Sequence, residues 1–343
     1  MQVVRYKLLT LAVLVLALSV ASSVAFAACC DQFKATTLVS STGKKADKQL
    51  INPWGLAYAP GAPFWLSDEG SGLSTLYNGA GVKQSLVVTV PPASGTGLGS
   101  PTGIVYNGSS EFAIDGWTSA FLFATLDGTI SGWSSFEPDN ALIAVNNHSS
   151  DAQYTGLAIT NHPTGNFIYA ADFWNNRVDV YDGTFSLVTS FTDTKLPAGF
   201  APFGIQDIGG QVYVAFAATD GKAGGYIDIF EENGTFVKTL IKTTHLNQPW
   251  GFAMAPADFG SLSNTLLISN NVNAGEINGF NPTTGAYVGT VETTAGKPIV
   301  INQLWGIEFG GGSTANGNID QLFYTAGPDN NLAGIFGVIN VVE

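Results

Sequence analysis

Short apolar runs, each ended by turn residues, fill most of the chain. Runs such as "NFIYAADF" and "RVDVYDG" are rich in β-branched and aromatic residues, and Gly, Pro, Asn and Asp separate them from the next run. This pattern is typical of β-strands joined by tight turns. The 343 residues include 41 Gly and only 11% charged side chains, which suits a turn-rich protein with a large core. The pattern therefore predicts an all-β fold.

One strand recurs six times along the chain, each time with a glycine as its third residue. The six segments read "PWGLAYAP", "PTGIVYNG", "YTGLAITN", "PFGIQDIG", "PWGFAMAP" and "LWGIEFGG". Their glycines are Gly55, Gly103, Gly156, Gly204, Gly251 and Gly306. The separations of 48, 53, 48, 47 and 55 residues suit a unit of four short strands with its turns. We therefore expect a six-bladed β-propeller of four-stranded antiparallel blades. The recurring strand is innermost, because glycine allows close backbone approach at the axis.

The two ends of the chain are expected to meet in the last blade. The final unit stops one strand short, whereas "FKATTLVSS", starting at Phe33, precedes the first inner strand and has no unit of its own. An open blade would leave edge hydrogen-bonding groups unpaired. We therefore predict that the N-terminal strand completes the last blade.

The segment "ADFWNNRVDVYDG" in the third unit could be a polar site or a turn. Its two ends belong to strand-like runs, and Asn175 and Asn176 can adopt φ > 0 between them. We interpret the segment chiefly as a β-hairpin.

The longer segment "YAADFWNNRVDVYDGTF" resembles the NHL repeat of six-bladed β-propellers, whose units carry an Asp, an Asn pair and an Arg between their second and third strands. The whole chain is similar to a bacterial family of exported, uncharacterised NHL-like propellers. The resemblance implies a propeller over about residues 33 to 340, although only the third unit carries the Asn-Asn-Arg motif. Lactone hydrolases and strictosidine-synthase-like proteins are similar in fold only, because their site motifs find no match here.

Residues 1–27 are predicted to be a signal peptide. Arg5 and Lys7 precede the apolar run "LLTLAVLVLALSVASSVAFA", and Ala25-Phe26-Ala27 fits the small-x-small cleavage pattern. An uncleaved anchor is the alternative, since the run approaches the ~20 apolar residues that span a bilayer. The small-residue exit favours cleavage, so residues 28–343 are expected to form a single propeller domain. We expect this domain to be exported, periplasmic or secreted, and monomeric, with no membrane insertion.

The cysteines and the charge add little chemistry. Cys29 and Cys30 are adjacent, so a disulfide between them would be strained and would not stabilise the fold. "FAAC" loosely resembles a bacterial lipobox, so lipid attachment at Cys29 is an alternative. Without Arg5 and Lys7, the formal charge is 11 − 26 = −15. This charge argues against nucleic acid or an anionic membrane surface as a partner.

Acid and amide side chains follow the second strand of each unit and form one candidate site. They are Asp68, Asp127, Asp172, Asp220, Asn270 and Asp329. A ring of such oxygens at one mouth of the channel could bind Ca²⁺, the only cofactor that the sequence suggests. The alternative is that each side chain accepts hydrogen bonds from backbone amides within its own turn.

Amide and tryptophan side chains at the entry to three inner strands form a second candidate site. They are Asn52, Trp54, Asn247, Gln248, Trp250, Asn302, Gln303 and Trp305. Indole rings beside amides suit a sugar or a peptide, because the ring gives apolar contact and the amide gives directed hydrogen bonds. The alternative is that these tryptophans pack between blades.

Two functions are therefore open. The first is a non-catalytic binding module for an extracytoplasmic protein, peptide or glycan, which would bind on the face that carries these tryptophan and amide side chains. The alternative is a Ca²⁺-type, metal-dependent hydrolase or lyase that uses the Asp/Asn ring. Catalytic motifs are lacking: His148, His162 and His245 form no short-spaced zinc-binding pair, and no Gly-x-Ser-x-Gly segment occurs.

Overall fold

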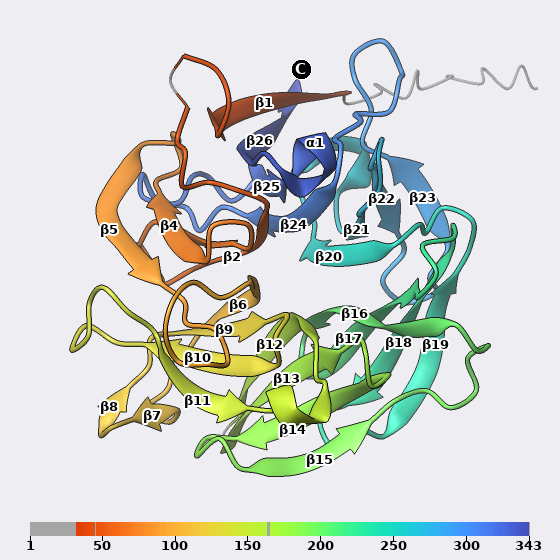
Figure 1. The fold of residues 1–343 in the computed structure, drawn as a ribbon. Helices are drawn as coiled ribbons and strands as arrows, with labels where there is room; N and C mark the ends of the chain where they lie inside the picture. The colour runs from red at the N-terminus through yellow and green to blue at the C-terminus, as the bar shows by residue number, and fades with distance from the viewer. Residues whose placement is uncertain (1–31, 45, 163–164, 343) are drawn as a thin grey trace, which may run out of the picture. The chain divides into compact units, whose positions relative to one another are not determined.

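The computed structural model describes residues 32–44, 46–162 and 165–342. These residues form six four-stranded antiparallel sheets arranged as a six-bladed β-propeller (Figure 1). The predicted fold is confirmed. The predicted signal peptide, with Cys29 and Cys30, lies outside the described residues.

The first three blades each run from the inner strand outward along the chain. Blade 1 contains β2 (Pro53–Tyr58), β3 (Phe64–Asp68), β4 (Leu73–Tyr77) and β5 (Lys83–Thr89). Blade 2 contains β6 (Pro101–Tyr106), β9 (Phe121–Thr125), β10 (Thr129–Trp133) and β11 (Leu142–Asn146). A hairpin of β7 (Ala113–Ile114) and β8 (Trp117–Thr118) interrupts blade 2, and the short helix η1 (His148–Ser150) follows it. Blade 3 contains β12 (Tyr154–His162), β13 (Gly165–Asp172), β14 (Arg177–Asp182) and β15 (Leu187–Phe191).

The last three blades follow the same plan, except that the outermost strand of blade 6 comes from the N-terminal end. Blade 4 contains β16 (Phe200–Asp207), β17 (Gln211–Ala218), β18 (Gly225–Glu231) and β19 (Phe236–Lys242). Blade 5 contains β20 (Pro249–Met254), β21 (Leu266–Asn270), β22 (Ile277–Phe280) and β23 (Tyr287–Thr290), with η2 (Gly260–Leu262) between its first two strands. Blade 6 contains β24 (Leu304–Phe309), β25 (Leu322–Ala326), β26 (Ile335–Val342) and β1 (Gln32–Ser40), with α1 (Pro328–Asn331) after β25. No described helix is long and apolar enough to cross a membrane.

The strands β2, β6, β12, β16, β20 and β24 form a ring around the axis, each in contact with the inner strands of both neighbouring blades. Glycine is required where they approach most closely. A Cβ atom on Gly103 would collide with the backbone of Leu157 in the next blade, and one on Gly204 would collide with the carbonyl of Trp250. The recurring glycine therefore has the structural role that the sequence predicts.

The N-terminal strand closes the ring as predicted. β1 pairs antiparallel with β26 from Gln32 opposite Val342 to Ser40 opposite Ile335 (Figure 1). Phe33 is only 2% exposed, and its ring centroid lies 4.9 Å from that of Phe259 in blade 5. The strand thus supplies both edge hydrogen bonds and a buried anchor between the last two blades.

The apolar cores lie between adjacent blades. Trp65 of blade 1, for example, stacks on Phe121 of blade 2 with ring centroids 4.2 Å apart. Since each core is shared by two blades, a missing strand in one blade also weakens the neighbouring interface.

Candidate functional site

An aromatic plug closes one end of the channel. The plug consists of the aromatic residues that precede the inner-strand glycine in four blades: Trp54, Phe203, Trp250 and Trp305. Trp54 and Trp305 stack with ring centroids 3.6 Å apart. Trp54 also lies 6.2 Å from Phe203, which comes from the blade on the opposite side of the axis. The plug therefore spans the axis.

Hydrogen bonds fix the plug in place. Nε1 of Trp305 donates to Oδ1 of Asn52 over 2.9 Å, and Nε1 of Trp250 donates to the carbonyl of Thr155 over 2.9 Å. The indole of Trp54 is 6% exposed, and those of Trp250 and Trp305 are 8% and 2% exposed. The rings pack on one another across the axis, which favours the alternative that these tryptophans have a packing role.

The amides predicted beside the tryptophans bond to neighbouring loops. Gln248 donates from Nε2 to the carbonyl of Lys222 over 2.9 Å, and Oδ1 of Asn302 accepts from the backbone amide of Ala274 over 3.0 Å. Three members of the set, Asn52, Gln248 and Gln303, have φ values of 46°, 52° and 53°. The repeated amide thus marks a left-handed backbone position before each of three inner strands. Asn247 lies in the same loop as Gln248 and is partly buried.

The predicted acid ring divides into two groups. Asp68, Asp172 and Asn270 end the second strand of their blades, opposite the first residue of the inner strand. Asp127, Asp220 and Asp329 lie beyond the ends of β9, β17 and β25, in the following turns. The six residues therefore do not share one repeat position, because the turns after the second strands differ in length and conformation.

The side chains of the first group bond within their own blades. Oδ2 of Asp68 accepts from the backbone amide of Thr75 over 3.0 Å and from its hydroxyl over 2.7 Å. Oδ2 of Asp172 accepts from Nδ2 of Asn175 over 2.7 Å. This bond stabilises the β13–β14 turn, where Asn176 has a φ of 54°, as the hairpin interpretation expects.

Asn270 of the first group and two members of the second group, Asp127 and Asp220, also contact nearby loops. Oδ1 of Asn270 accepts from the backbone amide of Asn247 over 3.0 Å, and Asp220 pairs with Nζ of Lys222 over 2.6 Å. Asp127 accepts from the backbone amide of Ala93, and Asp329 is exposed in α1. Among the described residues, no three His, Cys, Asp or Glu side chains lie close enough together to hold a metal ion. The structure therefore does not bring the predicted ring together as a metal site.

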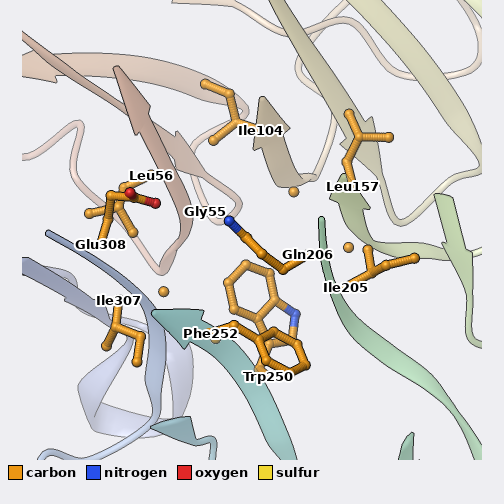
Figure 2. A pocket seen from close by; sticks show the side chains of 14 residues that line it. Gly55, Leu56, Ile104, Leu157, Ile205, Gln206, Trp250, Phe252, Ile307 and Glu308 are labelled. Carbon is orange, nitrogen blue, oxygen red and sulfur yellow. The ribbon is translucent and has the colours of Figure 1, made fainter. Parts of the chain in front are cut away.

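The opposite end of the channel holds a cavity that the sequence analysis missed. This cavity, here called the channel mouth, lies where β2, β6, β12, β16 and β24 end, and its volume is about 280 Å³. Leu, Ile, Val and Ala make up six of the eleven residues that line it. Its polar members are Tyr58, Tyr106, Gln206, Asp207 and Glu308. A narrower space of about 40 Å³ continues between the inner-strand glycines to Trp250 of the plug (Figure 2).

Gln206 and Glu308 stand where other blades have small apolar residues. Both lie two positions after the inner-strand glycine, a place held by Ala in three blades and by Val in one. Figure 2 shows the Gln206 side chain pointing into the channel and the Glu308 carboxyl on the wall beside Leu56. The repeats "PFGIQDIG" and "LWGIEFGG" already show these two polar residues at a position that is apolar in the other four repeats.

Burial changes the protonation of both carboxyl groups in the channel mouth. It raises the pKa of Glu308 to about 8, and no hydrogen bond or ion pair of this side chain exists among the described residues. The part of Glu308 that solvent reaches faces the cavity. Burial, followed by the negative charge of Glu232, raises the pKa of Asp207 to about 6. At neutral pH the channel mouth therefore contains one carboxylate and one largely protonated carboxyl group.

The tyrosine beside Glu308 stays protonated. Burial and the negative charge of Glu308 together raise the pKa of Tyr58 to about 12. The hydroxyl of Tyr58 is therefore a hydrogen-bond donor over the physiological range.

Replacing Glu308 by Gln should stabilise the protein at high pH. The raised folded-state pKa of Glu308 means that its contribution to stability is fully present below its ordinary value of 4.5 and is lost as pH rises through about 8. The Glu308→Gln variant stays neutral, so we expect its free energy of unfolding to exceed that of the parent by on the order of 2 kcal/mol near pH 9. Denaturant unfolding at that pH measures the difference. The gap should disappear near pH 4, and equal stability at both pH values would contradict the burial argument.

The plug and the channel mouth together define the class of protein. It is a six-bladed propeller whose channel is plugged at one end and has an open, polar mouth at the other. The chain is 30% identical over 332 residues to "Uncharacterized protein R648" of Acanthamoeba polyphaga mimivirus, covering 90% of this chain and 80% of that protein. It is 28% identical over 313 residues to "Uncharacterized protein L690" of the same virus, covering 85% of this chain and 80% of that protein. The chain belongs to the family of R648. The predicted bacterial family and NHL repeat are not confirmed by these relatives, which are viral, and no family model matches the chain.

Solved structures share the fold at low sequence identity. A Streptogramin B lyase superposes with a TM-score of 0.55 at 12% identity, covering 90% of this chain and 98% of that one. A Bacteroides thetaiotaomicron protein of unknown function gives a TM-score of 0.56 at 12% identity, covering 90% of this chain and 76% of that one. At this level of identity the similarity shows the propeller fold alone.

Proposed function

We propose that the protein is an exported, non-catalytic binding module whose protein, peptide or glycan ligand inserts one group into the channel mouth. The observation that carries the proposal is the replacement of small apolar residues by Gln206 and Glu308 at one repeat position, where both face the cavity. Both side chains are only partly buried, and no hydrogen bond of either one exists among the described residues. A ligand that supplies the missing hydrogen bonds accounts for their presence.

The shape of the channel mouth supports a ligand that enters only in part. Pockets that hold whole small molecules usually have volumes of about 300–1,000 Å³. The channel mouth, at about 280 Å³, lies just below this range and narrows toward the plug. Apolar walls with a few convergent polar groups are typical of binding sites. One sugar unit or one side chain of a larger ligand fits this description.

The other end of the channel has less to offer a ligand. Its tryptophans are buried in the plug, and amides such as Gln248 and Asn302 already bond to neighbouring loops. The proposal therefore keeps the binding class that the sequence suggests and moves the site to the opposite face. Export rests on the signal-peptide pattern of residues 1–27.

Arrays of glycans and peptides, probed with the labelled protein, test the proposal. Replacing Gln206 or Glu308 by Ala recreates the residue of other blades, and we expect each variant to bind the captured ligand at least about tenfold more weakly, because a charged or buried hydrogen bond is lost. Asn302→Ala, at the plugged end, is the matched control and should bind as the parent does. The opposite pattern, with loss only in Asn302→Ala, would return the site to the plugged end.

The metal-dependent hydrolase or lyase has weaker support. No three His, Cys, Asp or Glu side chains among the described residues could hold a metal ion, and Asp68 and Asp172 bond within their own blades. A fall of several degrees in melting temperature after EDTA treatment, reversed by Ca²⁺, would favour this alternative, since a bound ion at a hundred times its Kd stabilises by about 2.7 kcal/mol.

A further inference from the structure

We propose that the channel mouth selects a primary ammonium group on a short alkyl chain, either a free alkyl diamine or a lysine side chain. This inference rests on the proposed function and names the ligand chemistry of the same site. It follows from the charges, the unpaired atoms and the apolar walls of the cavity.

The polar groups of the channel mouth favour a cation. Asp207 comes from β16 and Glu308 from β24, so acidic residues of two blades line the cavity. No Lys, Arg or His is among the described residues that line the cavity. An anionic ligand would be repelled here, whereas an ammonium group gains charge-assisted hydrogen bonds.

The Glu308 carboxyl has acceptor atoms that a ligand in the cavity can reach. The Glu308 side chain has no hydrogen-bond partner among the described residues and is enclosed by the channel walls. Oδ1 of Asp207 also has no hydrogen-bond partner among the described residues, but it is buried, so Asp207 contributes its charge rather than a direct contact. Gln206 adds an amide oxygen to the same cavity, so acceptors on two residues are available to an ammonium group, which has three N–H donors.

The walls match the rest of such a ligand. Leu56, Ile104 and Ile159 give apolar contact for an alkyl chain, as the stems of lysine side chains require. Tyr58 and Tyr106 also line the cavity, and aromatic rings attract cations. A calcium ion fits less well, because it needs six to eight oxygen ligands and the described residues provide no cluster of three metal-ligating side chains.

Binding of an ammonium group should be coupled to loss of a proton. Three titratable groups share the cavity with Glu308: Tyr58 from β2, whose pKa is raised to about 12, Tyr106 from β6, and Asp207 from β16, whose pKa is raised to about 6. A cation favours the ionised form of Glu308, whose pKa is raised to about 8 in the free protein. Affinity should therefore increase from about pH 6 to about pH 8 and then level off.

Isothermal titration of the purified protein tests the inference. The probes are cadaverine and acetyl-lysine amide, and their neutral counterparts are pentanediol and acetyl-norleucine amide. We expect at least one cationic probe to bind at pH 8, more weakly at pH 6, and the neutral counterparts not to bind. Binding of cadaverine alone identifies a free diamine as the ligand class, and binding of acetyl-lysine amide alone identifies a lysine side chain.

The variants locate the effect. Glu308→Gln should weaken binding by about 10- to 100-fold, as expected for loss of a charged hydrogen bond, and should reduce the dependence on pH to the part that Asp207 contributes. Asp220→Asn, an exposed acid at the plugged end, should bind as the parent does. Circular dichroism confirms that each variant is folded.

Three results would overturn the inference: no binding of either cation at millimolar concentrations, equal binding of the neutral probes, or parent-like binding by Glu308→Gln. The proposed function is judged separately. A glycan or uncharged peptide that is lost in Gln206→Ala would leave the binding module standing while removing its ammonium specificity.

Discussion

Deleting residues 31–42 is expected to abolish cooperative unfolding of the propeller. The deletion removes β1, leaves β26 as an unpaired edge and takes Phe33 out of the contact between the last two blades. Loss of a buried phenylalanine alone costs about 3–5 kcal/mol. The lost strand pairing adds to this figure, and the sum approaches the ~5–15 kcal/mol by which a typical domain is stable. Differential scanning calorimetry should show no sharp transition.

Two point variants separate strand closure from chain shortening. Phe33→Ala removes the buried anchor and should lower the free energy of unfolding by about 3–5 kcal/mol. Thr36→Ala changes an exposed position of the same strand and should alter it by less than about 0.5 kcal/mol. A normal melting transition in the deletion variant would show that the ring is held closed without β1.

The fold was predictable because each blade repeats the same inner strand with its glycine. Glycine at the inner strand is required wherever neighbouring backbones approach closely, as Gly103 and Gly204 show. The missing strand of the last unit and the spare strand before the first unit then determine the closure. Each of these features depends on residue type and spacing, which a sequence displays directly.

The site was harder to predict because it depends on where side chains point. A tryptophan before an inner-strand glycine has the same local sequence whether it faces solvent or the axis, and only the assembled ring places Trp54 within 6.2 Å of Phe203. The acids share no single repeat position for a related reason, since Asp127 and Asp220 lie in turns beyond the strand ends. In the aligned repeats, Glu308 stands out as a polar residue at a position that is apolar in most blades. Its role becomes clear only from the structure, in which this position lines the channel.

Replacing Trp305 by Ala is expected to destabilise the protein strongly, because Trp305 holds the plug together. The ring is 2% exposed, stacks on Trp54 and donates to Asn52, which is itself buried. We expect a loss of about 3–5 kcal/mol, which lowers the melting temperature by more than about 5 °C. Trp305→Phe keeps an aromatic ring but leaves Oδ1 of Asn52 without its donor, so its loss should be smaller, at about 1–3 kcal/mol.

The matched control for this prediction is Trp174→Ala. Trp174 is 64% exposed in the turn between β13 and β14, and its removal should change the stability by less than about 0.5 kcal/mol. Thermal unfolding of the three variants measures the contrast between a tryptophan that fills the axis and one that faces solvent. If Trp305→Ala instead melted like the parent and lost a ligand, the tryptophans would be a binding surface, and the channel mouth would lose its place as the proposed site.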